Sequence, residues 1–289
     1  MVGSLSVLTK LTTLSISFFD EKTPPGQSRN HPDLLLRVIL PALTVFHYYG
    51  CNEYLEDFLA RINTPRLDQL KLDYLVLDIQ AGQLSWFIRR TESLNTSQFT
   101  RAEVIFYNMD SCFELDLPQG NSDQAQLNLN ISDQPPHLEV QVRSLTAVLA
   151  RVALFSNVTH LYAHGDFVDT SGIRTTDWLP FFHLFPAVRA LRLSWGVTAS
   201  MVSALEDTTE DMITDVFPAL RLIWLVKCED EDEDIYNDPV GSIEKFLSLR
   251  RFAGCPVTVV NTEDEFDEAE KKLLGHLDHP VDGGLVGVT

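Results

Sequence analysis

The sequence predicts an α/β protein built as an irregular curved solenoid, in which short parallel strands alternate with helices. The first observation is a repeated cell of apolar residues at relative positions 0, 3 and 5. The second is that apolar spacing changes from two residues inside a cell to about 3.6 residues between cells. The third is that the residue at position 4 is mostly polar or amphipathic, so each strand is expected to bury only one face. A wound parallel sheet would instead have strands that are apolar on both faces.

The repeat cell occurs in six copies, and a proline often stands two residues before its first position. Proline has a fixed φ and no N–H, so it can end a helix before a strand begins. The copies start 32, 24, 91, 30 and 32 residues apart. The longest interval is close to three periods, so the middle of the chain has room for degenerate copies. The six cells are Leu11, Leu14, Ile16; Leu43, Phe46, Tyr48; Leu67, Leu70, Leu72; Val158, Leu161, Ala163; Val188, Leu191, Leu193; and Leu220, Ile223, Leu225.

Between the cells, apolar residues follow the i, i+3, i+4, i+7 spacing of amphipathic helices. The two longest apolar stripes span residues 54–62 and 145–155. Each helix is expected to pack its apolar side on the strands, which predicts a leucine-rich-repeat-like arrangement with parallel strands on the concave face and helices outside. Shorter stripes lie at 84–88, 201–205, 212–216 and 243–247. Helical spacing also predicts core positions for Trp86, Phe87, Ile88, Trp178, Phe181, Phe182 and Phe185.

The middle of the chain, from about residue 101 to 142, is expected to be irregular and to contain a hairpin. Apolar residues alternate at 104–106 and again at 113–117, on either side of the turn-forming residues 108–111. This alternation is typical of two strands joined by a turn, and a third strand is expected at 127–131. Ala102, Ile105 and Tyr107 resemble one further, degenerate copy of the cell.

The repeats are expected to form a single domain over residues 1–277, because stacked repeats grow without needing a second core. An acidic loop is expected at 229–238. Thr262 and Glu265 have the spacing of a helix capping box, which predicts a C-terminal cap at 262–277. The Gly- and Val-rich residues 278–289 are expected to be a flexible tail.

Composition excludes several classes of partner. Lys and Arg number 22 against 41 Asp and Glu, so the net charge is −19. A surface of this sign repels phosphate backbones and anionic lipid, so neither nucleic acid nor membrane is an expected partner. No apolar run reaches the length of a membrane span, and neither a signal peptide nor an anchor is expected. The four cysteines lie far apart without a Cys-x-x-Cys pair, which predicts reduced thiols and a cytoplasmic or nuclear protein.

A family resemblance rests on four segments: residues 40–72, 185–196, 209–225 and 242–261. With the motifs LPALTVFHYYG, FPAVRALRLSWG, FPALRLIWL and FLSLRRFAGCP, the chain resembles a large group of fungal F-box-type proteins with degenerate leucine-rich repeats. The resemblance implies that the repeats present a substrate to a cullin-type ubiquitin ligase. In that family an F-box with a helical Leu-Pro-x-Glu-like segment precedes the repeats and binds a Skp-type adaptor. Here the first cell begins at Leu11, so we expect no F-box and no adaptor binding in this chain.

Motifs for catalysis or metal binding are not found, and we expect neither an enzyme nor a cofactor. The sequence has no Walker A loop, no His-Glu-x-x-His and no Gly-x-Ser-x-Gly. His160 and His164 have the spacing of metal ligands on a helix. On a strand they would lie about 13 Å apart, so we interpret them as exposed strand histidines.

The unbroken acidic run at residues 229–234 admits three interpretations. Its alternating Asp residues have the first spacings of a calcium loop, but Ile235 stands where the turn glycine belongs. A solvated loop is the simplest reading, and a docking site for a basic partner is the more specific one. The run consists of Glu229, Asp230, Glu231, Asp232, Glu233 and Asp234.

The sequence therefore predicts a protein–protein interaction module. By resemblance it is the substrate-recognition part of a ubiquitin ligase; the alternatives are a stand-alone scaffold and an α/β enzyme with an unrecognised site. Side chains at position 4 of each cell, and two places further along, should line the exposed strand face and bind the partner. An exposed Trp224 beside Arg192 would have the composition of an interface hot spot. The predicted partner-binding residues are His47, Tyr49, Lys71, Tyr162, His164, Arg192 and Trp224.

Overall fold

The computed structural model describes most of the repeat region of the chain. The predicted acidic loop at 229–238, the flexible tail and nearly all of the predicted cap at 262–277 lie outside the described residues. The described ranges are 8–18, 37–50, 52–74, 82–96, 99–107, 111–116, 126–132, 137–152, 154–165, 173–226 and 243–262.

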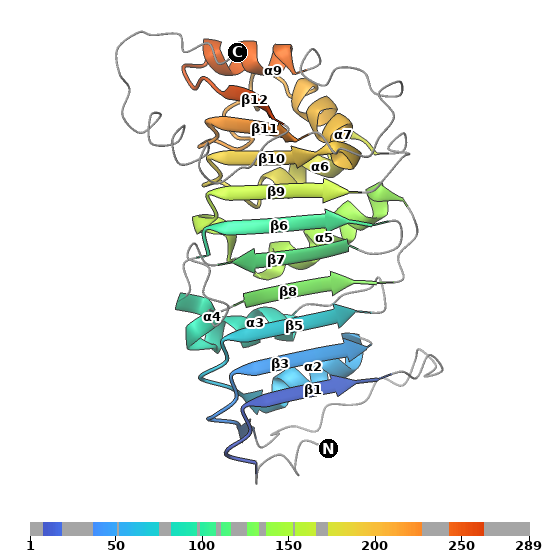
Figure 1. The fold of residues 1–289 in the computed structure, drawn as a ribbon, viewed down its shortest axis with the longest axis vertical. Coiled ribbons are helices and arrows are strands. Elements are labelled where there is room, and N and C mark those ends of the chain that lie inside the picture. Colours follow the sequence, from blue (N-terminus) through green and yellow to red (C-terminus); the bar gives the residue numbers. More distant parts are fainter. Residues whose placement is uncertain are drawn as a thin grey trace.

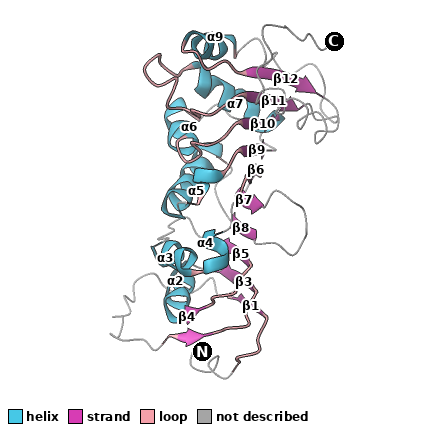
Figure 2. Cartoon of the chain, turned by 90° about the vertical axis from the view of Figure 1, so that its left-hand side faces the viewer, coloured by secondary structure: helices cyan, strands magenta, loops and turns pink. Residues whose placement is uncertain are grey.

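The chain forms an open, mostly parallel ten-stranded sheet with helices on one side (Figures 1 and 2). The strand order is β1-β3-β5-β8-β7-β6-β9-β10-β11-β12, so β1 and β12 are the two edges and the sheet does not close into a barrel. This confirms the predicted α/β class. In Figure 2 the helices lie on one side of the strands, and no helix in the described ranges covers the other side, which we call the open face.

The strands are short and the helices connect them. Those of the large sheet are β1 (Thr13–Ser17), β3 (Val45–Gly50), β5 (Gln69–Tyr74), β6 (Arg101–Phe106), β7 (Ser111–Asp116), β8 (Gln126–Ile131), β9 (His160–Gly165), β10 (Ala190–Ser194), β11 (Leu222–Val226) and β12 (Thr258–Thr262). A separate parallel pair consists of β2 (Val38–Ile39) and β4 (Ile62–Asn63). The helices are α2 (Asn52–Arg61), α3 (Gly82–Arg90), α4 (Glu92–Thr96), α5 (Leu138–Val152), α6 (Thr175–Phe182), α7 (Trp195–Glu206) and α9 (Glu244–Phe252), with a 3-10 turn, η1, at Phe155–Asn157.

Positions 3 and 5 of the repeat cell form two rows across the sheet, on the side that the helices cover. From Leu14 of β1 to Val259 of β12, each residue of the first row is the register partner of the next residue on the neighbouring strand. Because side chains alternate along a strand, a row in register keeps all its members on one face. Of the first row's members, the eight from Phe46 to Ile223 are nearly inaccessible to solvent. The first row is Leu14, Phe46, Leu70, Leu127, Leu115, Ala102, Leu161, Leu191, Ile223 and Val259; the second is Ile16, Tyr48, Leu72, Leu129, Phe113, Val104, Ala163, Leu193 and Leu225.

The middle of the sheet contains the predicted hairpin, and its three strands are inserted in reverse order. β6 and β7 pair antiparallel, with Val104 opposite Phe113, and β7 pairs antiparallel with β8. The chain leaves β5, passes over two strand positions to β6, returns through β7, and places β8 beside β5. Helix α5 then leads back to β9, which lies parallel beside β6.

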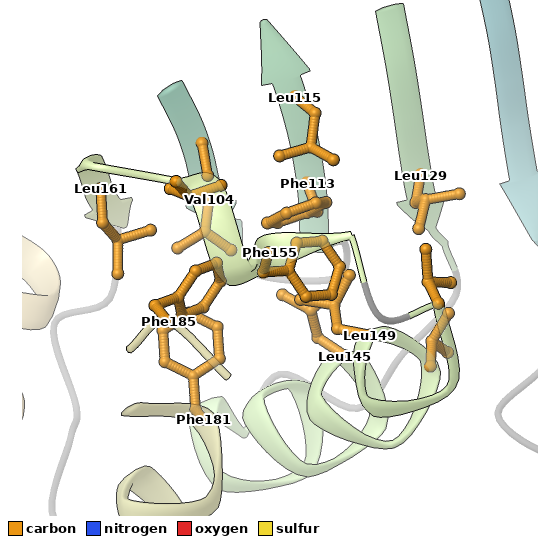
Figure 3. Packing of buried hydrophobic residues seen from close by; sticks show 14 of the residues in the cluster. Val104, Phe113, Leu115, Leu129, Leu145, Leu149, Phe155, Leu161, Phe181 and Phe185 are labelled. Carbon is orange, nitrogen blue, oxygen red and sulfur yellow. The ribbon is translucent and has the colours of Figure 1, made fainter. Parts of the chain in front are cut away.

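Aromatic and aliphatic side chains fill the space between this hairpin and the helices (Figure 3). The ring of Phe113 on β7 meets the ring of Phe155 edge to face, with centroids 5.4 Å apart. Phe185 lies 5.4 Å from Phe155 and 5.2 Å from Phe181 of α6. Leu145 and Leu149 of α5 complete the buried layer beneath the hairpin. Apolar contacts therefore join the reversed middle to the regular C-terminal repeats.

Three details of the expected packing are wrong. The degenerate copy of the cell is Phe99, Ala102 and Val104, since Val104 is buried whereas Tyr107 is 42% exposed. The stripe at 212–216 forms consecutive turns, not a helix, because its hydrogen bonds are isolated and do not continue from residue to residue. Trp86 is 36% exposed, although its neighbours Phe87 and Ile88 are buried as expected.

A buried arginine ties these turns to α9. Arg250 is fully buried, and its guanidinium donates to the carbonyl oxygens of Ile213 and Leu220. Both carbonyls belong to the turn segment that precedes β11.

None of the helices described is long and apolar enough to cross a membrane.

Candidate protein-binding face of the sheet

The open face carries a row of side chains that lies between the two buried rows. We call it the outer row; it corresponds to position 4 of the repeat cell. Strand register places its members beside one another on all ten strands, and their side chains alternate in direction with those of the buried rows. The outer row is Ser15, His47, Lys71, Asn128, Glu114, Glu103, Tyr162, Arg192, Trp224 and Val260.

Five of the seven predicted binding residues belong to the outer row, and the other two lie two residues further along their strands. His47 and Lys71 are exposed, while Tyr162 and Arg192 are partly exposed. Tyr49 and His164 stand on β3 and β9 in the adjacent row of the same face, two residues from His47 and Tyr162. The structure thus brings all seven residues to one face, although β3 and β9 are separated by four strands.

Trp224 was expected to be exposed, and this expectation is wrong. Its side chain is 1% exposed and packs with Ala190, Leu222 and Val260 in a small apolar cluster. Ala190, Leu222 and Val260 supply apolar surface around the indole, although Arg192 stands opposite Trp224 on β10. An indole surrounded by apolar side chains is more stable when it packs on them than when it extends into water. Trp224 is therefore part of the folded framework.

The N-terminal part of the open face is hollowed. An open hollow of about 350 Å³ lies over β1, β3 and β5 and is lined by Ser15, Ser17, His47, Tyr48, Tyr49, Lys71 and Asp73. Its lining provides hydroxyl, imidazole, ammonium and carboxylate groups. Such a set can form directional hydrogen bonds to a polar surface.

The centre of the open face contains two glutamates that stand directly opposite each other, Glu103 on β6 and Glu114 on β7. Like charges in this arrangement destabilise a pair of strands unless each finds another partner. Glu114 accepts a hydrogen bond from the amide of Asn128 on β8, and Glu103 contacts His164 on β9, with 2.5 Å between Oε1 and Nε2. The two carboxylates are thus drawn toward opposite neighbours.

Cys112 lies beside this acidic centre, with its Sγ 3.8 Å from Oε1 of Glu114. Burial, and secondly the negative charge of Glu114, raise the pKa of the Cys112 thiol to about 12. The thiol therefore stays protonated at neutral pH and is a poor nucleophile. Cys112 and Cys255, the cysteines within the described ranges, are free thiols.

Three basic side chains, those of Arg101, His164 and Arg192, lie near Glu103 on the C-terminal side of the face. The guanidinium of Arg101 lies 5.4 Å and that of Arg192 lies 5.8 Å from the ring centre of Tyr162. The hydrogen bond with His164, together with the charges of His164, Arg192 and Arg101, lowers the pKa of the Glu103 carboxyl. Burial, and then the charge of Arg101, lower the pKa of His160. The open face thus has an acidic centre flanked by basic groups on both sides.

Sequence reasoning missed Glu103, Glu114 and Asn128, which occupy the outer row between Lys71 and Tyr162. The signal for Glu103 was present: once Phe99, Ala102 and Val104 are recognised as a cell, Glu103 stands at position 4. Glu114 and Asn128 belong to the hairpin strands, where no cell is complete. The acidic run from Glu229 to Asp234 lies outside the described residues.

Within the described residues, no three His, Cys, Asp or Glu side chains gather in a way that could hold a metal ion.

Comparisons of the chain with protein-family models, with curated proteins and with solved structures gave no match. The open face offers both signs of charge, amide and hydroxyl groups, and the ring of Tyr162. This composition suits the recognition of a polypeptide surface.

Proposed function

We propose that the protein is an interaction module that binds another protein on the open face of its sheet. The observation that carries this proposal is the outer row, which presents His47, Lys71, Glu103, Tyr162 and Arg192 in register across the sheet. Helices cover the opposite side of the sheet, so the backbone under these residues is held in place (Figure 2). A rigid surface reduces the ordering cost of binding.

The alternation of charge along the open face is a second support. Lys71 lies on one side of the acidic centre, and Arg101 and Arg192 lie on the other. Complementary patterns of charge favour one partner in one orientation, because a wrong register brings like charges together. Tyr162, between its two arginines, has the amphipathic character that is common in interface hot spots.

We propose further that the strands and helices form a degenerate leucine-rich-repeat-like solenoid, with the open face as its concave side. The recurrence of the cells and the in-register buried rows support this proposal. On the resemblance to fungal F-box-type proteins, the partner that we propose first is a substrate of a cullin-type ubiquitin ligase in the cytoplasm or nucleus. A stand-alone scaffold would use the same face without the ubiquitin pathway.

Site-specific photo-crosslinking in the source cells tests the binding face. A photoreactive residue placed at His47 or Tyr162 should capture the same partner. The same residue at Ala147 or Ala150, which are exposed on α5 on the helix side, provides the matched control. Lys71→Ala with Tyr162→Ala should weaken capture by roughly thirtyfold, the loss expected for two hot-spot contacts.

Capture from Ala150 but not from Tyr162 would contradict the proposed binding face. The ubiquitin role is tested separately: removal of the protein from the cells should lengthen the half-life of the captured partner. An unchanged half-life would leave the binding face intact and favour the scaffold.

A further inference from the structure

A second surface with the composition of an interface lies on the helix side of the sheet. We call it the Trp86 patch, and it consists of Arg37, Ile39, Trp86, Arg89 and Arg90. Trp86, Arg89 and Arg90 share one side of α3, because positions i, i+3 and i+4 are neighbours on a helix surface. Ile39 belongs to the short parallel pair β2–β4, beside the end of α2, and Arg37 directly precedes β2. Figure 2 places α3, α2 and β4 together, away from the open face.

Two arginines stack on the indole of Trp86. The guanidinium carbon of Arg90 lies 3.8 Å from the ring centre, and that of Arg37 lies 4.1 Å from it. Arg90 is held in place, since its Nη2 donates to the carbonyl oxygens of Leu59 in α2 and Ile62 in β4. The orientation of Trp86 is thus fixed by the fold, so its exposed edge is presented without further ordering.

The positive charge of the patch has no carboxylate partner among the described residues. Within the described residues, none of Arg37, Arg89 and Arg90 forms a salt bridge. By contrast, Arg61 and Arg143 each contact a carboxylate oxygen at 2.6 Å. Burial, and secondly the charge of Arg37, lower the pKa of Arg90 to about 10. Such a cluster of cations is notable in a protein of net charge −19.

The patch also exposes apolar surface. Ile39 is 56% exposed and Trp86 is 36% exposed. Large apolar side chains in the rest of the described chain are mostly buried. An apolar centre with arginines around it has the composition that is enriched at the centre of protein interfaces.

We propose that the Trp86 patch is a second docking site, and that it takes a protein segment in which large apolar side chains are flanked by carboxylates. The apolar side chains would cover Trp86 and Ile39, and the carboxylates would pair with Arg37 and Arg89. Phosphate-rich partners fit less well, because the net charge of −19 repels an extended phosphate backbone at long range. The patch is separate from the open face, so the protein can hold two partners at once.

Peptide binding to the purified full chain tests this site directly. The probe is a fluorescently labelled twelve-residue peptide with Leu-Phe between two runs of five Glu. Two control peptides replace either Glu with Lys or Leu-Phe with Gly-Ser. The expected result is binding of the acidic, apolar peptide only, with weaker binding as salt rises and a shift of the Trp86 indole N–H signal in NMR spectra.

Two variants and a matched control locate the binding site. Arg37→Glu and Trp86→Ala should each weaken binding by roughly thirtyfold. The control is Arg251→Glu on α9, which removes an exposed arginine beside the 95% exposed Phe252 and makes the same change of charge. Arg251→Glu should leave binding unchanged, and thermal melting should show that all three variants fold.

Three results would overturn the proposal. One is equal binding by wild type, Arg37→Glu and Arg251→Glu. Another is binding of a single-stranded oligonucleotide, or of vesicles with anionic lipid, that equals peptide binding and is lost in Arg37→Glu. A third is reversible dimerisation in sedimentation experiments that Arg37→Glu abolishes, which would assign the patch to a second copy of the chain.

Discussion

Nε2 of His164 lies 2.5 Å from Oε1 of Glu103, and this contact joins β9 to β6 across the open face. Both side chains are partly exposed, at 38% and 31%. Water and salt therefore screen the pair, and its contribution to the stability of the protein is small. Because Glu103 titrates, the pair makes the stability of the protein depend on pH.

Glu103→Gln should lower the free energy of unfolding at pH 6 by about 0.5–1 kcal/mol. The pKa of Glu103 is lower in the folded protein than its ordinary value. The stabilisation is therefore complete above the unfolded pKa of about 4.3 and disappears as the pH falls through the lower, folded pKa. Urea unfolding between pH 2.5 and 7 measures this difference. Glu244→Gln, at an exposed position on α9, is the control, and a Glu103→Gln effect that grows as the pH falls below about 4 would contradict the assignment.

Leu191→Ala should destabilise the fold by about 2–5 kcal/mol, because Leu191 is fully buried in the first buried row. Arg192→Ala, one residue further along β10, should cost less than about 1 kcal/mol, because Arg192 stands on the open face. Thermal or urea unfolding of the two variants gives the comparison. Equal losses would show that the inner and outer faces of β10 are assigned incorrectly.

Trp224→Ala should destabilise the protein by about 3–5 kcal/mol, as expected for a buried aromatic residue. The loss arises because the cavity would open within the cluster of Ala190, Leu222 and Val260. Trp224→Phe should recover most of the stability, since it keeps a large ring in the same place. A stable, well-folded Trp224→Ala protein would mean that the indole does not pack as described.

Cys112 should react with iodoacetamide at pH 8 on the order of a thousandfold more slowly than a small free thiol, because so little thiolate is present. With a pKa of about 12, its rate should rise about tenfold with each pH unit up to about pH 11. Mass spectrometry of the peptide that contains Cys112 measures the rate. Glu114→Gln should make the reaction faster, because it removes a negative charge that raises this pKa. A rate that levels off near pH 9 would contradict the raised pKa.

The regular parts of the fold follow closely from the sequence. Each recognised cell, such as that of Val188, Leu191 and Leu193, places its positions 3 and 5 in the two buried rows. The reason is that apolar alternation at a fixed spacing specifies both the strand and its buried face. The hairpin at 101–116 was predictable for the same reason. The order of its strands was not, because the pairing of β8 with β5 depends on contacts between residues far apart in the chain.

The open face was predictable in its position but not in its chemistry. Position 4 identifies His47, Lys71, Tyr162 and Arg192, yet the exposure of each depends on its neighbours on adjacent strands. Trp224 shows this most clearly, since its burial results from Ala190 and Val260 on the flanking strands. The stacking of Arg37 and Arg90 on Trp86 likewise joins residues from two separate segments, which periodicity along one helix cannot reveal.

The reversed order of the middle strands affects how the protein assembles during synthesis. When β6 and β7 have left the ribosome, β5 still lacks its next neighbour, because β8 comes later in the chain and fits between β5 and β7. β8 thus fills the last gap in the sheet, where it pairs in parallel with β5 and antiparallel with β7. In an ordinary repeat array each new unit adds to the end of the previous one and can also be lost from that end. Here the separation of β1, β3 and β5 from the hairpin would break the parallel β5–β8 pair, so the N-terminal strands and the hairpin are expected to unfold together.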